Sequence, residues 1–184
     1  MYWRGDLKVN ANKASAVQAF ISYFTSPSFK VVARYRMYRW LYQRGPIGKA
    51  LHKPLWFANC KMGAYISPKA KIGASFYLPH PIGVVVGEGV VIGDDVTLFQ
   101  GVTLGVRREG GHDYPTLGNG VTVYANATIV GAVVLGDRAK VGANAFVRES
   151  IPADTTVVSA PATVVPRKNA SARETQISKA VAHS

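Results

Sequence analysis

The chain has 184 residues, of which 48% are hydrophobic and 17% charged, enough apolar material for the core of one domain or of one domain with a small appendage. No apolar run approaches the ~20 residues of a membrane span, and the start does not resemble a cleaved signal, so we expect a cytoplasmic protein. The single cysteine, Cys60, excludes an internal disulfide and a cysteine metal cluster. Its apolar neighbours indicate packing rather than nucleophilic catalysis.

The formal charge of +12 is unevenly distributed. Residues 1–62 contain eleven lysines and arginines against one acid, Asp6, which gives +10. Residues 63–184 contain eleven against nine, which gives +2. A cationic N-terminal third attracts anionic partners such as membrane lipid, nucleic acid or an acidic substrate. No nucleic-acid-binding motif accompanies this charge, so we expect no nucleic-acid partner.

The N-terminal third has the pattern of helices. Residues 11–25 predict a first helix, and Ser26-Pro27-Ser28 is a break with helix-start residues. Residues 29–42 predict a second helix and residues 47–57 a short third one, interrupted at Pro54. The second helix mixes aromatic residues with arginines, which suits two arrangements. It packs its aromatics on the end of the following domain while the arginines stay in water, which we favour, or it lies on an anionic membrane surface.

From Leu117 to Pro152 the sequence repeats every six residues. The first place is always aliphatic and is occupied by Leu117, Val123, Ile129, Leu135, Val141 and Val147. The fifth place is small or aliphatic throughout. A period of six excludes an amphipathic helix and fits a short strand followed by a tight turn, three times per coil. The pattern therefore predicts a parallel β-helix, with Gly, Asn and Asp in its turns.

The same frame begins at about Ile66 and is broken twice. The step from Leu78 to Val86 is eight residues and contains His80, and the stretch 105–116 is a longer excursion that contains His112. Departures from a regular repeat project residues off the prism, where chemistry can be placed. After Pro152 the pattern decays. We expect a helical module over 1–62, a β-helix over 63–168 and a polar tail over 169–184.

Residues 80–105, His-Pro-Ile-Gly-Val-Val-Val-Gly-Glu-Gly-Val-Val-Ile-Gly-Asp-Asp-Val-Thr-Leu-Phe-Gln-Gly-Val-Thr-Leu-Gly, resemble the core of the serine acetyltransferases, which are hexapeptide-repeat acyltransferases. Residues 141–145 and 151–168 resemble the closing coils of that family. The resemblance spans about Ile66 to Lys168. It implies a left-handed β-helix, acetyl-CoA as co-substrate, no metal, and a homotrimer with active sites between subunits.

In that family the histidine matching His80 is a general base that takes the proton of the acceptor hydroxyl, which then attacks the acetyl-CoA thioester. An imidazole with a pKa near 6.5 suits this role because it is neutral at cell pH and can carry the proton. Ala125 and Ala143 match turn positions where small residues let pantetheine approach. Gly105 is assigned to the same CoA site, and Arg167 with Lys168 is assigned to the 3′-phosphate.

Three positions depart from the family pattern. Tyr65 stands where an aspartate orients the histidine, and Pro79 where a second aspartate helps hold the amino acid. Residues 111–115, Gly-His-Asp-Tyr-Pro, replace a Gly-Asp-Arg-His-Pro loop that holds the serine carboxylate. A pocket without these charges should discriminate poorly for free serine. We assign acceptor contacts to Tyr65, His112, Asp113 and Tyr114. The candidates for orienting His80 are Glu88, Asp113 and Tyr65.

The short basic N-terminal module resembles that of O-acetyltransferases in exopolysaccharide or capsule synthesis, such as the colanic acid enzyme. Their acceptors are sugars on lipid-linked units at the inner membrane. We therefore expect an acetyl-CoA-dependent O-acetyltransferase of a sugar hydroxyl, cytoplasmic or peripheral at the inner membrane. The alternatives are a serine O-acetyltransferase and an inactive trimeric scaffold or membrane-binding module. A γ-carbonic-anhydrase-type lyase would need three histidines, and the repeat region offers only His80 and His112.

Overall fold

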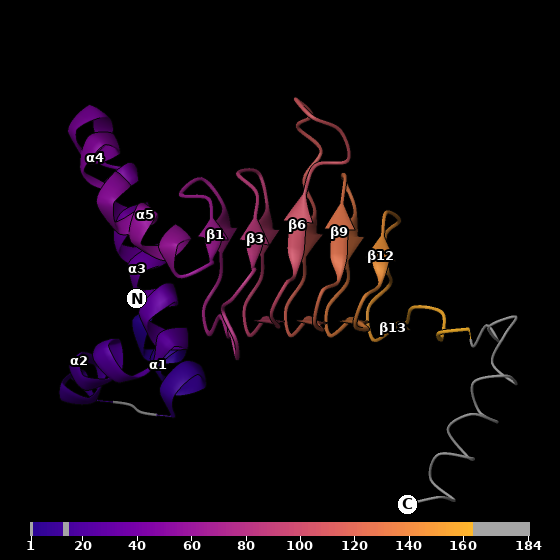
Figure 1. The fold of residues 1–184 in the computed structure, drawn as a ribbon, viewed down its shortest axis with the longest axis horizontal. Coiled ribbons are helices and arrows are strands. Elements are labelled where there is room, and N and C mark those ends of the chain that lie inside the picture. The colour runs from indigo at the N-terminus through magenta and orange to yellow at the C-terminus, as the bar shows by residue number, and fades with distance from the viewer. Residues whose placement is uncertain (1, 13–14, 164–184) are drawn as a thin grey trace, which may run out of the picture.

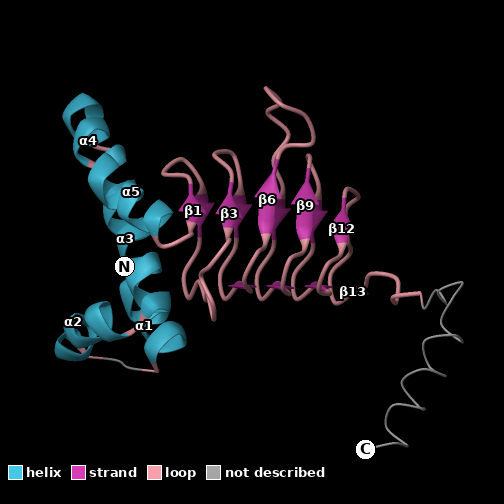
Figure 2. Ribbon diagram, in the orientation of Figure 1, coloured by secondary structure: helices cyan, strands magenta, loops and turns pink. Residues whose placement is uncertain are grey.

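A computed structural model describes residues 2–12 and 15–163 of the chain. A layer of helices lies at one end of a stack of short strands (Figure 1), and Figure 2 shows that helices and strands do not alternate. The helices are α1 (Trp3–Ala11), α2 (Ala16–Thr25), α3 (Pro27–Tyr42), α4 (Gly45–Leu51) and α5 (Lys53–Lys61). In the part of the chain that is described, no helix is long and apolar enough to cross a membrane.

The helix boundaries differ from those predicted because local capping residues divide the module more finely. The helix predicted over 11–25 is α2, which begins only at Ala16, and α1 precedes it over residues that were not predicted to be helical. Asn12 ends α1 in the left-handed conformation at φ 50°. Ser26 caps α3 by accepting a hydrogen bond from the Phe29 amide, so the predicted break is confirmed. Pro54 does not interrupt a helix but lies in the first turn of α5, where its missing N–H costs nothing.

Helix α3 packs on the end of the β-helix rather than lying free. Val31, Val32, Tyr35 and Tyr38 are fully buried in the common core. This confirms the packing interpretation of the second predicted helix. The expectation that its arginines stay in water is wrong for Arg36, whose guanidinium donates to the Asp6 carboxylate and the Ile72 carbonyl.

The remainder of the described chain forms a parallel β-helix of three sheets. Sheet A contains β1 (Tyr65–Ile66), β3 (Val85–Val86), β6 (Thr103–Gly105), β9 (Thr128–Val130) and β12 (Phe146–Val147), in that order. Sheet B contains β2 (Lys71–Ile72), β4 (Val91–Ile92), β7 (Thr116–Leu117) and β10 (Val134–Leu135). Sheet C contains β5 (Thr97–Leu98), β8 (Thr122–Val123), β11 (Lys140–Val141) and β13 (Thr156–Val157).

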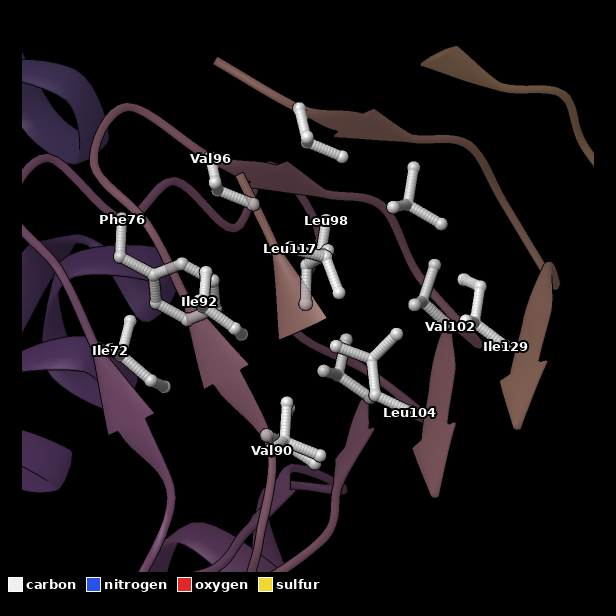
Figure 3. Packing of buried hydrophobic residues seen from close by; sticks show 14 of the residues in the cluster. Ile72, Phe76, Val90, Ile92, Val96, Leu98, Val102, Leu104, Leu117 and Ile129 are labelled. Carbon is white, nitrogen blue, oxygen red and sulfur yellow. The ribbon is translucent and has the colours of Figure 1, made fainter. Parts of the chain in front are cut away.

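The predicted six-residue frame is the frame of the core. Each first-place aliphatic residue is the inward residue of its strand, and the sheet register stacks Ile66, Val86, Leu104, Ile129 and Val147 in one column. Figure 3 shows Leu104 and Ile129 of this column among other buried side chains inside the prism. The decay predicted after Pro152 begins one strand later than expected, because β13 still pairs with β11.

The first coil is closed by side chains of the helical module. The coil's backbone groups that point away from the second coil have no strand to pair with. At any sheet edge, such unpaired groups can pair with another chain. Tyr38 donates to the Ile66 carbonyl at 2.7 Å and Tyr35 to the Ala70 carbonyl at 2.8 Å. The rest of the coil, up to Leu78, is hydrogen-bonded by Arg36 and by the α1 residues Asp6 and Asn10.

The turns between strands stack into edges of the prism. We call the turns from sheet C to sheet A, residues 79–84, 99–102, 124–127 and 142–145, the histidine edge. The turns from sheet A to sheet B, residues 67–70, 87–90, 106–115 and 131–133, are the loop edge. Both edges border sheet A, on opposite sides. Left-handed residues such as Asn126 (φ 60°) and Asn144 (φ 59°) make the tight turns of the histidine edge, as the composition predicted.

Candidate functional site

The first break in the repeat places His80 at the start of the histidine edge. The turn that carries it is held from behind by the helical module. Asn10 accepts a hydrogen bond from the Leu78 amide at 3.2 Å, and Ser28 donates to the Pro79 carbonyl at 3.2 Å. The His80 side chain itself is exposed. Among the described residues, no hydrogen bond or ion pair engages its imidazole.

Ala125 and Ala143 lie on the same edge as His80. Backbone bonds tie the successive turns together: Gly101 donates to Ile82, Asn126 to Gln100, and Asn144 to Ala125. The turns therefore form a continuous column along the prism. Ala143 is exposed and Ala125 half-buried. The structure thus brings together the predicted base and two of the residues assigned to the CoA site.

The other predicted residues lie on the loop edge or on sheet A. Gly105 ends β6 at the start of the long loop, and its carbonyl accepts from the Gly131 amide. Tyr65 lies on the outer face of sheet A, with its ring 5.5 Å from that of Trp56. His112 and Asp113 are exposed on the loop. Within one chain, the structure does not bring these loop residues to His80. Arg167 and Lys168 lie outside the described residues.

Glu88 is engaged at the loop edge rather than at His80. Its carboxylate pairs with the Lys69 ammonium at 2.6 Å, and this hydrogen bond holds the pKa of Glu88 below its usual range. Because both side chains are largely exposed, the pair contributes little to stability. The proposal that Glu88 orients His80 therefore has no support from the contacts of a single chain.

Tyr114 is fixed against the prism. Its ring lies over Gly87 and Gly89, and a Cβ at Gly89 would come within 2.2 Å of the ring. These two glycines therefore permit an approach that any side chain would block. Burial raises the pKa of the Tyr114 hydroxyl, the largest influence on that group. The loop thus presents a rigid aromatic residue between the exposed His112–Asp113 pair and the core.

Sequence reasoning missed the residues that support the His80 turn. Asp6 and Asn10 are four residues apart and flank the buried Leu7 on one helix face, a spacing that could have identified them. The first helix was expected to begin only at residue 11. Gln100, on the histidine edge, has a buried Oε1 without a hydrogen-bond partner among the described residues, and no sequence signal marked it.

Two other features carry no catalytic chemistry. A cavity of about 880 Å³ lies between α3 and sheet B, lined among others by Arg36, Trp40 and Ile92. It is remote from the histidine edge, and Arg36 is already paired there with Asp6.

Burial raises the pKa of the Cys60 thiol, which disfavours the nucleophilic thiolate. Within the described ranges, no three His, Cys, Asp or Glu side chains gather to hold a metal.

Comparison with known proteins places this geometry in a family. Residues 114–149 match the bacterial transferase hexapeptide (six repeats) family. A serine acetyltransferase of Mycobacterium tuberculosis is 34% identical over 166 residues, covering 88% of this chain and 71% of the relative. A serine acetyltransferase isoform 3 from Entamoeba histolytica, solved with cysteine, superposes with a TM-score of 0.76 at 28% identity, covering 94% of this chain and 63% of that one. A serine acetyltransferase solved with CoA superposes with a TM-score of 0.66 at 35% identity, covering 74% and 56%.

These similarities include the three-sheet prism, the helices that precede it and the hexapeptide frame. The β-helix is accordingly left-handed, as the resemblance implied. The chain belongs to the hexapeptide-repeat acyltransferases, in the serine acetyltransferase-like branch that uses acetyl-CoA as co-substrate.

Proposed function

We propose that the protein transfers the acetyl group of acetyl-CoA to an acceptor hydroxyl, with His80 as the general base. One observation carries this proposal. The exposed His80 imidazole stands at the head of the column of turns that contains Ala125 and Ala143. A thioester bound along that column would reach the imidazole with its reactive end.

The chemistry requires a single base. Neutral His80 takes the hydroxyl proton as the acceptor oxygen attacks the thioester carbonyl. The carbon–sulfur bond then breaks, and the imidazolium returns the proton to the leaving CoA thiolate. A positioned base of this kind contributes roughly 10²–10⁴-fold to the rate. Among the described residues of a single chain no acid orients the imidazole, so we propose that groups approaching in the assembled site fix its tautomer.

We propose that the site is completed between subunits of a homotrimer. His80 lies on one edge of sheet A and the loop residues His112 to Tyr114 lie on the opposite edge. A three-fold arrangement around sheet A would set the histidine edge of one subunit against the loop edge of the next. Each site would then take its base and CoA column from one chain and its acceptor contacts from another.

Two acceptors are supported by different observations. The similar proteins are named serine acetyltransferases, so the comparisons by themselves favour L-serine. The residues of this chain favour a neutral hydroxyl. Pro79 stands where the family has an aspartate that helps hold the amino acid, and Asp113 and Tyr114 stand where it has the arginine and histidine that hold the serine carboxylate, so the charges that a zwitterion needs at these positions are missing. Tyr65 and Tyr114 offer flat faces on which a sugar ring stacks. We propose a sugar hydroxyl of a surface-polysaccharide precursor first and L-serine second.

The test is release of free CoA thiol from acetyl-CoA, with L-serine and with a panel of sugars and glycan precursors. Turnover with a glycan and none with serine supports the first acceptor. Turnover with serine at millimolar concentration establishes the second and refutes our interpretation of Pro79 and Asp113. If CoA binds but none of the acceptors supports thiol release, the result would support an inactive scaffold.

The role of His80 has its own control. His80→Ala should lower kcat by about 10²–10⁴-fold without loss of the folded assembly. His112→Ala removes an exposed imidazole from the loop edge and should raise the acceptor KM with a smaller effect on kcat. An unchanged kcat in His80→Ala would overturn the catalytic assignment.

A further inference from the structure

Helix α2 presents a face of large apolar side chains that the described part of the chain leaves uncovered. Val17, Phe20, Ile21 and Phe24 are spaced i, i+3, i+4 and i+7, so they lie on one side of the helix. They are 71%, 69%, 54% and 64% exposed, while Ser22 on the other side is buried. The rings of Phe20 and Phe24 are in contact, with centroids 5.3 Å apart. A contiguous apolar surface of this kind marks an interaction site.

Helix α2 lies on the far side of the helical module from the β-helix. In the view of Figure 1, α1 lies between α2 and the strands. Helix α2 contains no charged residue and has a well-formed start, with a capping box between Ser15 and Gln18. It therefore forms a defined helix whose apolar face is free for a partner.

The net charge of the helical module favours an anionic partner. Residues 1–62 carry a net +10, and their one acid, Asp6, is buried and paired with Arg36. Lys30 reaches the C-terminal end of α2, where its ammonium donates to the Phe24 carbonyl at 3.5 Å. A second copy of this module would bring like charges together, whereas an anionic lipid surface neutralises them.

We propose that the α2 face, Val17, Phe20, Ile21 and Phe24, inserts into the surface of an anionic bilayer. The apolar side chains enter the boundary between headgroups and acyl chains, and the basic module holds the phosphate groups. Helix α3, by contrast, packs its Val31, Tyr35 and Tyr38 face against the β-helix. The inference does not depend on which acceptor is acetylated.

The experiment is co-sedimentation of the full chain with phosphatidylcholine vesicles, with and without phosphatidylglycerol. The wild type should bind the phosphatidylglycerol vesicles, and less so at high salt, because salt screens the basic module. Phe20→Gln/Phe24→Gln should reduce the partition coefficient by at least about tenfold, since two large apolar side chains no longer leave water.

The matched control is Val91→Gln/Val134→Gln, which removes two exposed apolar side chains from the outer face of sheet B and should bind like the wild type. His80→Ala should also bind like the wild type, which separates this proposal from the catalytic one. Three outcomes would overturn it: no binding by the wild type, undiminished binding by the phenylalanine variant, or equal binding to purely zwitterionic vesicles. A smaller particle mass for the phenylalanine variant without lipid would assign the α2 face to a second copy instead.

Discussion

Two tyrosines of α3 have phenols that are fully buried and hydrogen-bonded to the first coil of the β-helix. Burial raises the pKa of Tyr35 to about 12, against smaller opposing effects of Arg39 and Arg36. Burial likewise raises the pKa of Tyr38 far above its usual range. Burial disfavours ionisation of either phenol while α3 stays docked, so the contact between module and prism weakens at alkaline pH.

The raised pKa of Tyr35 makes the free energy of unfolding depend on pH. The pKa of Tyr35 is about 10 in the unfolded chain and higher in the folded one, so its contribution is complete below pH 10. It is lost as the pH rises through about 12. We expect the free energy of unfolding to fall in this window, and to fall less steeply in Tyr35→Phe. Urea unfolding across alkaline pH checks this, with the more exposed Tyr124→Phe as the control. Parallel pH profiles for wild type and Tyr35→Phe would contradict the prediction.

At the scale of elements, α1 supports the turn that precedes His80. The Asn10 amide donates to the Phe76 carbonyl at 2.7 Å and accepts from the Leu78 amide at 3.2 Å. Both backbone groups are buried, so neither can turn to water instead. Helix α1 thus takes the place that a neighbouring strand would occupy at this position.

Asn10→Ala should therefore cost about 2–4 kcal/mol, because it leaves two buried backbone groups unpaired. We also expect a lower kcat, since the turn that carries His80 loses its support. Asn119→Ala is the matched control, because the Asn119 side chain makes only exposed bonds: it accepts from the Asp94 amide and donates to the Asp137 carboxylate. Urea unfolding and hydrogen exchange of the Leu78 amide measure the effect. Equal loss of stability in the two variants would show that α1 does not hold the turn.

At the scale of the whole molecule, the trimer proposal predicts complementation. His80→Ala lacks the base and Asp113→Ala lacks an acceptor contact, so each homotrimer should be weakly active. Co-expressed, the two variants should regain activity, because a mixed trimer contains an interface with an intact His80 and an intact Asp113. The particle mass should be three times the 19.8 kDa chain mass. Sites contained within one chain would give no recovery on mixing.

The sequence predicted the prism well, because a residue's place within the six-residue repeat decides whether its side chain points inward. A residue such as Ile129 is inward because it occupies the first place of a repeat, whatever the distant chain does. The helical module was predicted less well, because its boundaries depend on single residues such as Asn12 and Ser15 that are ambiguous without their neighbours. The arrangement of His80, Glu88 and Asp113 could not be predicted, because it depends on which edge of the prism each turn occupies.

The helical cap sets the length of the particle. A β-helix has no intrinsic end, because every coil offers its neighbour the same row of backbone groups that it received from the previous one. Here the row facing backwards is occupied by Tyr38, Tyr35, Arg36 and Asn10. The cap is in this sense a terminator of strand addition. A chain without it would expose a template for further coils, and end-to-end growth into fibres would become the competing fate of the prism.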